Sequence, residues 1–214
     1  MFLLFKDLQK KFHDIKDPGS EDEHLIKCIM DWCTQNEISR EKAFKEICEI
    51  APEHTEFACL LGVLYHYGIG TDVDLEKMIY WYKISAESGD SLGQTQLGWC
   101  YSEAFGIVRD TKLAFCWNLR SAQGGNSSGA YNLAHCYRWG VGTAIDYQKS
   151  FYWYKISAEA GIVSSQFSLG RCYRFSWGAN KDLHKALYWY RKSICNGYGT
   201  WYFELDEAFS NSMW

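Results

Sequence analysis

Apolar and small residues recur at helical spacing through the central part of the chain. Ala130, Leu133, Ala134 and Tyr137 are spaced i, i+3, i+4 and i+7, so they share one face of a helix. Glycines follow at once, and they tolerate the positive φ that ends a helix and turns the chain. A second stripe consists of Ser150, Trp153, Ser157 and Ala158. The pattern predicts two short helices, A and B, joined by a glycine loop.

This helix pair recurs every 36 residues without an insertion. The repeated tryptophan stands at Trp81, Trp117, Trp153 and Trp189, and the repeated tyrosine at Tyr65, Tyr101, Tyr137 and Tyr173. A fixed period of this length is typical of solenoids, in which each unit buries its apolar face against the next. We therefore predict an all-α solenoid whose four helix-turn-helix units cover residues 55–90, 91–126, 127–162 and 163–198.

The repeated positions also predict how the two helices of a unit pack. A small residue follows each repeated leucine of helix A, as in Leu97-Gly98 and Leu133-Ala134. We expect this small residue to let helix B approach closely, and the repeated tryptophan to fill the space between neighbouring pairs. An aspartate recurs before each helix B, as at Asp146, where its side chain can cap the helix.

The two ends of the chain depart from the 36-residue register. Residues 1–54 carry helical stripes, with Ser39 as a cap for a helix that contains Ala43, Phe44 and Ile47. We expect a helical N-terminal cap there. Residues 199–214 keep the register only in part, because Asp206 takes the place of the small residue. We expect them to form a C-terminal capping helix that ends the stack.

The repeated pattern reads Ala-x-x-Leu-Gly-x-x-Tyr-x-x-Gly-x-Gly, followed by Asp, Lys-Ala, Trp, Ala and Gly. It resembles the Sel1-like repeat, a relative of the tetratricopeptide repeat, over residues 55–198. Departures from the pattern include Ala134, Ser176 and Ile194. The resemblance implies a right-handed superhelix of α/α units that acts as an adaptor for other proteins.

Composition limits the classes of partner. The formal net charge is -4 and the isoelectric point is about 5.9, so the chain lacks the basic surface that nucleic-acid binding normally requires. The sequence shows no export signal, no apolar run long enough for a membrane span and no lipidation motif. We therefore expect a cytoplasmic protein whose partner is a protein or peptide, and neither nucleic acid nor a membrane.

The chain shows no combination of residues that would support an enzyme. Nine cysteines form no Cys-x-x-Cys pair, and the recurring Cys100, Cys136 and Cys172 are expected to be free core thiols. The six histidines show no metal-ligand spacing. Ala51-Pro52-Glu53 matches a kinase motif, but the glycine-rich phosphate loop and the catalytic motifs of a kinase are missing. We expect no catalytic residue, no cofactor and no metal.

The favoured function is a protein-interaction scaffold, and the resemblance implies a role in signalling. In tetratricopeptide repeats helix A lines the concave face, and this analogy gives the predicted binding residues. They are Trp99, Tyr131, His135, Arg138, Trp139, Phe167, Arg171, Arg174 and Phe175, with Ser102 and Glu103 beside them. Aromatic residues and arginines favour an acidic extended peptide or a C-terminal carboxylate as ligand.

Two alternatives remain open at this stage. Sel1-like arrays are also attached to kinase domains, so the chain could be the regulatory part of a kinase. Some bacterial proteins that resemble Sel1-like arrays have been proposed to bind or cleave cell-wall analogues, which would make it a hydrolase. The sequence leaves the partner and the oligomeric state undetermined.

Overall fold

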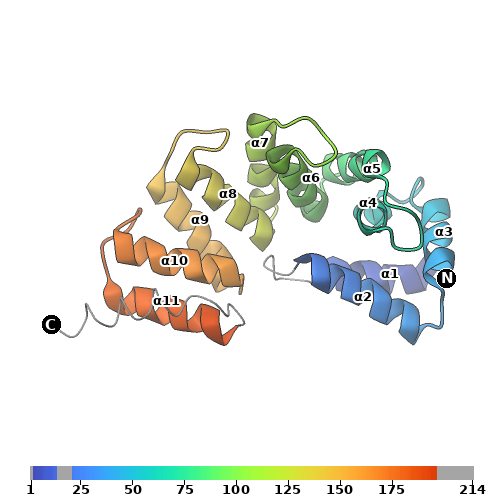
Figure 1. Cartoon of the computed structure of the whole chain (residues 1–214), viewed down its shortest axis with the longest axis horizontal. Coiled ribbons are helices and arrows are strands. Elements are labelled where there is room, and N and C mark those ends of the chain that lie inside the picture. The colour runs from blue at the N-terminus through green and yellow to red at the C-terminus, as the bar shows by residue number, and fades with distance from the viewer. Residues whose placement is uncertain (1, 14–20, 197–214) are drawn as a thin grey trace.

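The computed structural model describes residues 2–13 and 21–196, which form eleven α-helices, one 3₁₀ turn and no strand (Figure 1). The bounds are α1 Phe2–His13, α2 Glu21–Gln35, α3 Arg40–Ile50, η1 Thr55–Phe57, α4 Ala58–Tyr67, α5 Leu75–Glu87, α6 Ser91–Glu103, α7 Thr111–Gln123, α8 Ser127–Trp139, α9 Tyr147–Glu159, α10 Val163–Phe175 and α11 Leu183–Cys195. The helices follow one another around an arch. The all-helical solenoid predicted from the sequence is confirmed. The C-terminal capping helix predicted for residues 199–214 lies outside the described residues.

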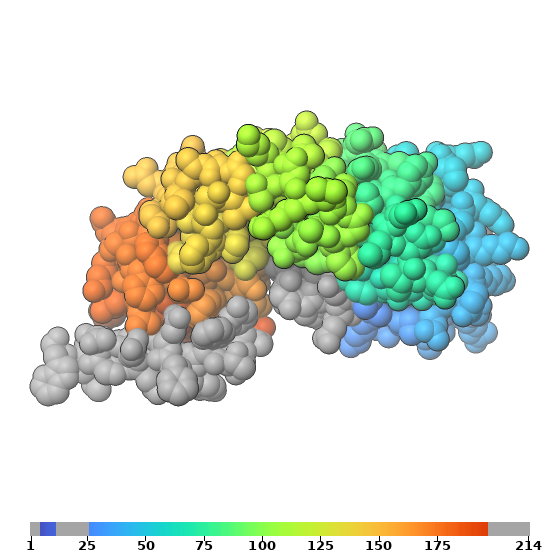
Figure 2. Space-filling view, turned by 45° about the horizontal axis from the view of Figure 1, so that its top comes forward, coloured from blue at the N-terminus to red at the C-terminus, as the bar shows by residue number. Residues whose placement is uncertain are grey.

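Consecutive helices pack in pairs, and each pair stacks on the next. Helices A are α4, α6, α8 and α10, and helices B are α5, α7, α9 and α11. Each A helix contacts its own B helix most, and each B helix then contacts the following A helix. Successive units lie side by side in Figure 2. Contacts of α4 with α6 and of α6 with α8 exceed those between the corresponding B helices, so these A helices lie on the inner side of the curve.

The repeated aspartates cap the B helices, as predicted. Asp74, Asp110, Asp146 and Asp182 each have extended backbone angles and accept a hydrogen bond from a backbone N–H in the first turn. For Asp146 the donor is the N–H of Lys149, at 2.9 Å. These hydrogen bonds lower the pKa of Asp74, Asp146 and Asp182. The aspartates are therefore structural caps and do not form a row of catalytic carboxylates.

The small residue of helix A is matched by the residue that follows the repeated tryptophan. Trp153 is half-buried, whereas the next residue, Tyr154, is fully buried. A Cβ added to Gly170 would lie 2.6 Å from Cδ1 of Tyr190, so the small residue of helix A makes room for the residue after the tryptophan. The tyrosine ring, which reaches across the pair, is therefore the large side chain that matches the small residue. Trp153 packs against two buried clusters, one shared by α7 and α8 and one shared by α8, α9 and α10, so it lies between neighbouring pairs as predicted.

The N-terminal region continues the stack more closely than the sequence suggested. Helix α3 is capped by Ser39, which accepts a hydrogen bond from the N–H of Lys42 at 3.2 Å. Phe44 then packs edge-on against Tyr65 with ring centroids 5.3 Å apart, as Phe151 packs against Tyr173 at 5.4 Å. Phe44 and Tyr65 are one residue closer in the sequence than Phe151 and Tyr173. Helix α3 thus takes the place of a B helix before α4. The one-residue offset places it outside the strict 36-residue register.

A glycine in each loop fixes how closely neighbouring units approach. A Cβ added to Gly142 would clash with the carbonyl oxygen of Thr111, in the first turn of α7. Gly178 has the same relation to Tyr147 at the start of α9. Both glycines have positive φ, 69° and 74°. The loop after one A helix therefore rests directly on the first turn of the B helix before it.

Candidate functional site

The predicted binding residues divide into two groups along the inside of the arch. Trp99, Tyr131 and His135 line one cavity between α6, α7 and α8, which we call the α6–α8 pocket. Arg138 and Arg171 meet at the ring of Trp177, and we call these three residues the arginine cluster. The structure therefore brings together residues that the sequence placed on one face, but in two sites with different chemistry.

The α6–α8 pocket is a cavity of about 250 Å³. Its wall combines aromatic rings with polar and charged groups. The lining residues are Trp99, Ser102, Glu103, Arg109, Asn118, Tyr131, Asn132, His135, Cys136 and Val141. The ring of Trp99 is held from behind by Phe105 at 5.0 Å and by His66 at 5.7 Å between centroids. This wall is preorganised, as small-molecule and side-chain pockets usually are.

His135 lies between opposite charges at this pocket. Burial of the imidazole lowers its pKa, the positive charge of Arg138 lowers it further, and the negative charge of Glu103 opposes both. Part of the residue remains exposed, with the ring 6.1 Å from that of Trp139. The lowered pKa favours a neutral imidazole at pH 7, so the ring can both donate and accept a hydrogen bond.

The arginine cluster holds two positive charges close together. The guanidinium carbon of Arg138 lies 3.3 Å from the centre of the Trp177 ring, and that of Arg171 lies 5.2 Å from the same ring. Arg138 is only 9% exposed, and burial together with the charge of Arg171 lowers its pKa. No carboxylate among residues 2–13 and 21–196 forms an ion pair with either arginine. The buried Nε of Arg171 also donates no hydrogen bond there.

Three further predicted residues border the arginine cluster. Trp139 is 56% exposed and lies under the guanidinium of Arg138 at 4.9 Å, and Phe175 is 44% exposed and packs against Trp177 at 4.8 Å. Arg174 lies over the Phe175 ring at 4.9 Å. Exposed aromatic rings next to arginines are frequent at the centres of protein interfaces.

The structure removes Phe167 from the predicted surface. It is 7% exposed and packs against Tyr190 at 5.4 Å, within a small cluster that includes Ala186. Its position on helix A faces the tyrosine of its own unit rather than the inside of the arch. The predicted exposure of Phe167 was wrong because the residues assigned to the inner face of helix A include positions that point toward helix B of the same unit.

Two residues at these sites were missed from the sequence. Trp177 stands in the loop at a position that is apolar in every unit, like Val141, which indicates contact with helix A. Asn118 stands where the other units have Tyr82, Tyr154 and Tyr190. Both signals were present in the aligned repeats, but their meaning depended on knowing which side of helix B is buried.

The three recurring cysteines of helix A are core thiols, whereas Cys116 and Cys195 are exposed. Cys100, Cys136 and Cys172 are buried and free, and burial raises the pKa of Cys100 and Cys172 to about 12. These thiols stay protonated and are poor nucleophiles. Among the described residues no group of His, Cys, Asp or Glu has the arrangement of a metal site. No described helix is long and apolar enough to cross a membrane.

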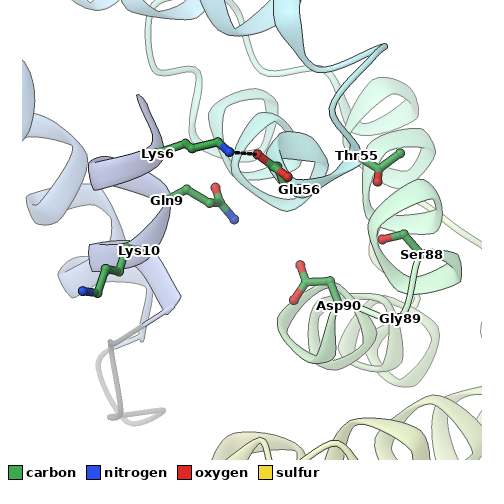
Figure 3. A pocket seen from close by; sticks show the side chains of 8 residues that line it. All are labelled: Lys6, Gln9, Lys10, Thr55, Glu56, Ser88, Gly89 and Asp90. Carbon is green, nitrogen blue, oxygen red and sulfur yellow. Dashed lines mark ion pairs between the residues drawn. The ribbon is translucent and has the colours of Figure 1, made fainter. Parts of the chain in front are cut away.

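A second, wider hollow lies at the N-terminal end of the arch (Figure 3). Its volume is about 630 Å³, and its walls come from α1, the turn at η1 and the connection between α5 and α6. Lys6 reaches across to Glu56 with an N–O distance of 3.5 Å, and Asp90 accepts a hydrogen bond from Ser85 at 2.6 Å. Lys6 and Glu56 thus neutralise one another, and Asp90 already has a hydrogen-bond donor, so this hollow is a weaker candidate than the inside of the arch.

Comparison with known proteins agrees with the repeat geometry. The Sel1 repeat model matches residues 55–90, 91–126, 127–162 and 163–198. A Sel1 repeat protein from Oxalobacter formigenes superimposes with a TM-score of 0.73 at 23% identity, covering 92% of this chain and 81% of that one.

A protective antigen of uropathogenic Escherichia coli with an SLR fold gives a TM-score of 0.72 at 25% identity over 84% of this chain. The match spans 39% of that antigen's length. No curated protein matches the chain. Because the repeat model covers more than half of the sequence, the chain belongs to the Sel1 repeat family, whose members generally serve as non-catalytic protein-interaction scaffolds.

Proposed function

We propose that this protein is an adaptor that binds an acidic, extended peptide segment or a C-terminal carboxylate along the inside of its arch. The ligand crosses the second to fourth repeat units, from the α6–α8 pocket to the arginine cluster. The observation that carries the proposal is the pair Arg138 and Arg171, which share the Trp177 ring without a carboxylate partner in the described chain.

Electrostatics favours an anion as the missing partner. A buried guanidinium without a counter-charge is costly, and its planar donors match a carboxylate in two-point geometry. Stacking on Trp177 offsets part of this cost but satisfies none of the N–H donors. A carboxylate from a partner would satisfy donors that the described fold leaves open, including Nε of Arg171.

The neighbouring rings supply the apolar part of such an interface. Trp139 and Phe175 are both substantially exposed and lie on either side of the arginines. A peptide that pairs a carboxylate with the arginine cluster would bury both rings. Burial of aromatic rings around a desolvated charge pair is the arrangement that dominates interface energetics.

The test uses fluorescein-labelled hexaglutamate as probe and hexaserine as its neutral control, with binding measured by fluorescence anisotropy at low and high salt. We expect hexaglutamate to bind and its affinity to fall with salt. Replacing Arg171 and Arg174 together by Gln should weaken binding at least tenfold, about 1.4 kcal/mol. Arg138 is left unaltered in this variant, because it is buried and its replacement would also remove packing.

The matched control is Arg120→Gln with Lys155→Gln, which makes the same charge change on helices α7 and α9. Both residues are exposed, and neither lines the α6–α8 pocket or the arginine cluster. This pair should bind hexaglutamate as the unaltered protein does, apart from a small general loss. If the control weakens binding as much as the Arg171 and Arg174 pair, the attraction is general and the proposed site is wrong.

A further inference from the structure

The second repeat unit differs from the others at the residue that fills the space between helices A and B. Tyr82, Tyr154 and Tyr190 are buried at this position, and the second unit has Asn118 instead. Asn118 is also buried, with 3% of its surface exposed, and it lines the α6–α8 pocket. A much smaller side chain therefore stands where three units place a phenol ring.

The geometry relates the pocket to the missing ring. A Cβ added to Gly98 would lie 2.6 Å from Oδ1 of Asn118, and the same construction at Gly170 meets Cδ1 of Tyr190 at 2.6 Å. The amide oxygen of Asn118 thus stands where the near edge of a tyrosine ring would stand. The outer part of that ring has no counterpart in the second unit.

The first unit shows where the hydroxyl end of such a tyrosine ring would lie. In the first unit the hydroxyl of Tyr82 lies 3.4 Å from Nδ1 of His66. The residue that corresponds to His66 in the second unit is Ser102, 36 positions later, and Ser102 lines the α6–α8 pocket. The cavity therefore includes the region that a tyrosine of this unit would have filled.

The polar end of the pocket has an unused acceptor. Oδ1 of Asn118 is buried and accepts no hydrogen bond from the described residues. The amide nitrogen of Asn118 makes only a long contact of 3.9 Å with Sγ of Cys136. A buried amide oxygen favours a ligand that brings a hydrogen-bond donor, since leaving it without one is unfavourable.

We propose that the α6–α8 pocket receives a tyrosine side chain of the partner peptide, which supplies the phenol that the second unit lacks. Its ring packs against Trp99 and Tyr131, and its hydroxyl donates a hydrogen bond to Oδ1 of Asn118. A cavity of roughly 150 Å³ can bind benzene, so 250 Å³ accommodates a substituted ring. The polar groups at the pocket, Glu103, Arg109 and His135, are placed to contact the peptide around the tyrosine.

This inference rests on the proposed function, because it names a residue of the same partner, but it is tested with a probe that does not need the arginine cluster. The probe is p-cresol, which is the tyrosine side chain, and its control is toluene, which lacks the hydroxyl. Binding is followed by NMR through the indole N–H signals of the tryptophans. We expect p-cresol to bind with a millimolar Kd, and toluene to bind at least fivefold more weakly.

Two variants place the probe in the pocket. Asn118→Tyr restores the ring of the other units, so it should abolish p-cresol binding and raise the melting temperature. Asn118→Leu keeps a similar volume but removes the acceptor, so p-cresol and toluene should then bind equally. Should Asn118→Tyr fail to fold, the comparison of the two probes with Asn118→Leu still decides the question.

Three results would overturn the inference. They are the absence of saturable p-cresol binding, equal binding of p-cresol and toluene to the unaltered protein, and binding that persists in Asn118→Tyr. The first result is also the one expected if the pocket holds only water. Failure of hexaglutamate to bind, with p-cresol binding intact, would reject the acidic ligand and leave the tyrosine pocket in place.

Discussion

The second and third repeat units have the same helix lengths and the same aspartate cap, yet the buried helix-B position lines the α6–α8 pocket in the second unit and is filled by a tyrosine ring in the third. Helices α6, α7, α8 and α9 each contain 13 residues, and Asp110 and Asp146 cap the two B helices alike. The units differ at Asn118 and Tyr154, and they differ again in the loop, at Ala104 and Gly140.

This comparison separates what the repeat needs from what it can vary. The caps, the loop glycines and the small residues of helix A maintain the stacking of the units. One substitution at the buried helix-B position leaves that stacking unchanged and opens a cavity beside the inner face. Binding capacity in such an array therefore resides where one unit departs from the others. The variants below either erase or sharpen that difference.

The largest effect should come from giving the third unit the asparagine of the second. Tyr154→Asn removes a fully buried ring and should lower the free energy of unfolding by about 3 to 5 kcal/mol, measured by urea denaturation. Trp153→Ala is the neighbouring control, and since Trp153 is only half-buried it should cost less. An equal loss in both variants would contradict the assignment of the tyrosine as the central packing residue.

A loop change should disturb both units alike. Gly142→Ala places a methyl group against the carbonyl oxygen of Thr111 and keeps a φ of 69°, so we expect a loss of about 2 to 3 kcal/mol. Gly125→Ala meets no atom within 4 Å at a φ of 85° and should cost only about 1 kcal/mol. Thermal denaturation gives both values. Similar losses would show that the loop contact contributes nothing.

Making the second loop resemble the third should stabilise the protein. Ala104 has a φ of 58°, a conformation that glycine adopts without strain. Ala104→Gly should therefore raise the free energy of unfolding by up to about 1 kcal/mol. Ala160→Gly, at a helix C-cap with a φ of -72°, is the control and should lower it slightly. A decrease for Ala104→Gly would mean that this backbone is not strained.

The smallest expected effect is a pH dependence of stability that arises from His135 at the α6–α8 pocket. Burial and Arg138 lower the pKa of His135 in the folded state, so the unfolded chain binds this proton more readily. Stability should fall as pH decreases below about 6.5, and it should fall less in His135→Gln. Because the ring is partly exposed, we expect a difference of only about 1 °C in melting temperature between pH 7 and pH 5. A variant with an unchanged pH profile would place the titration elsewhere.

The sequence was sufficient for the fold because the repeat carries the information many times over. A single helical stripe is ambiguous, but Leu133, Tyr137 and Asp146 recur with their partners in four units at constant spacing. The offset of one residue between Phe44 and Tyr65 breaks this constant spacing, so the repeat pattern did not identify α3 as a B helix. Local signals alone, such as the Ser39 cap, still predicted a helix there.

The site could be predicted only as a set of positions. The repeat pattern does not show how deeply each side chain is buried. Phe167 was predicted to lie on the surface, but it packs against Tyr190. Arg138 was predicted to be accessible, but it is buried against the Trp177 ring. Whether a residue faces the partner helix or the inside of the arch depends on the rotation of helix A within its pair. That rotation is set by the contact between Gly170 on α10 and Tyr190 on α11. The hydrophobic pattern of one helix alone does not contain this information.

The loop glycines have a consequence for how the chain can be lengthened or shortened. Gly142 touches only the first turn of α7, and Gly178 touches only the first turn of α9. Each joint is therefore made between a loop and its immediate predecessor, and the two joints have the same parts. Deletion of residues 127–162 as one block would bring Gly178 against the carbonyl oxygen of Thr111, so the fourth unit would stack directly on the second. Whole units can in this way be gained or lost, whereas a deletion whose length is not a multiple of 36 residues leaves a loop without its contact on the preceding B helix.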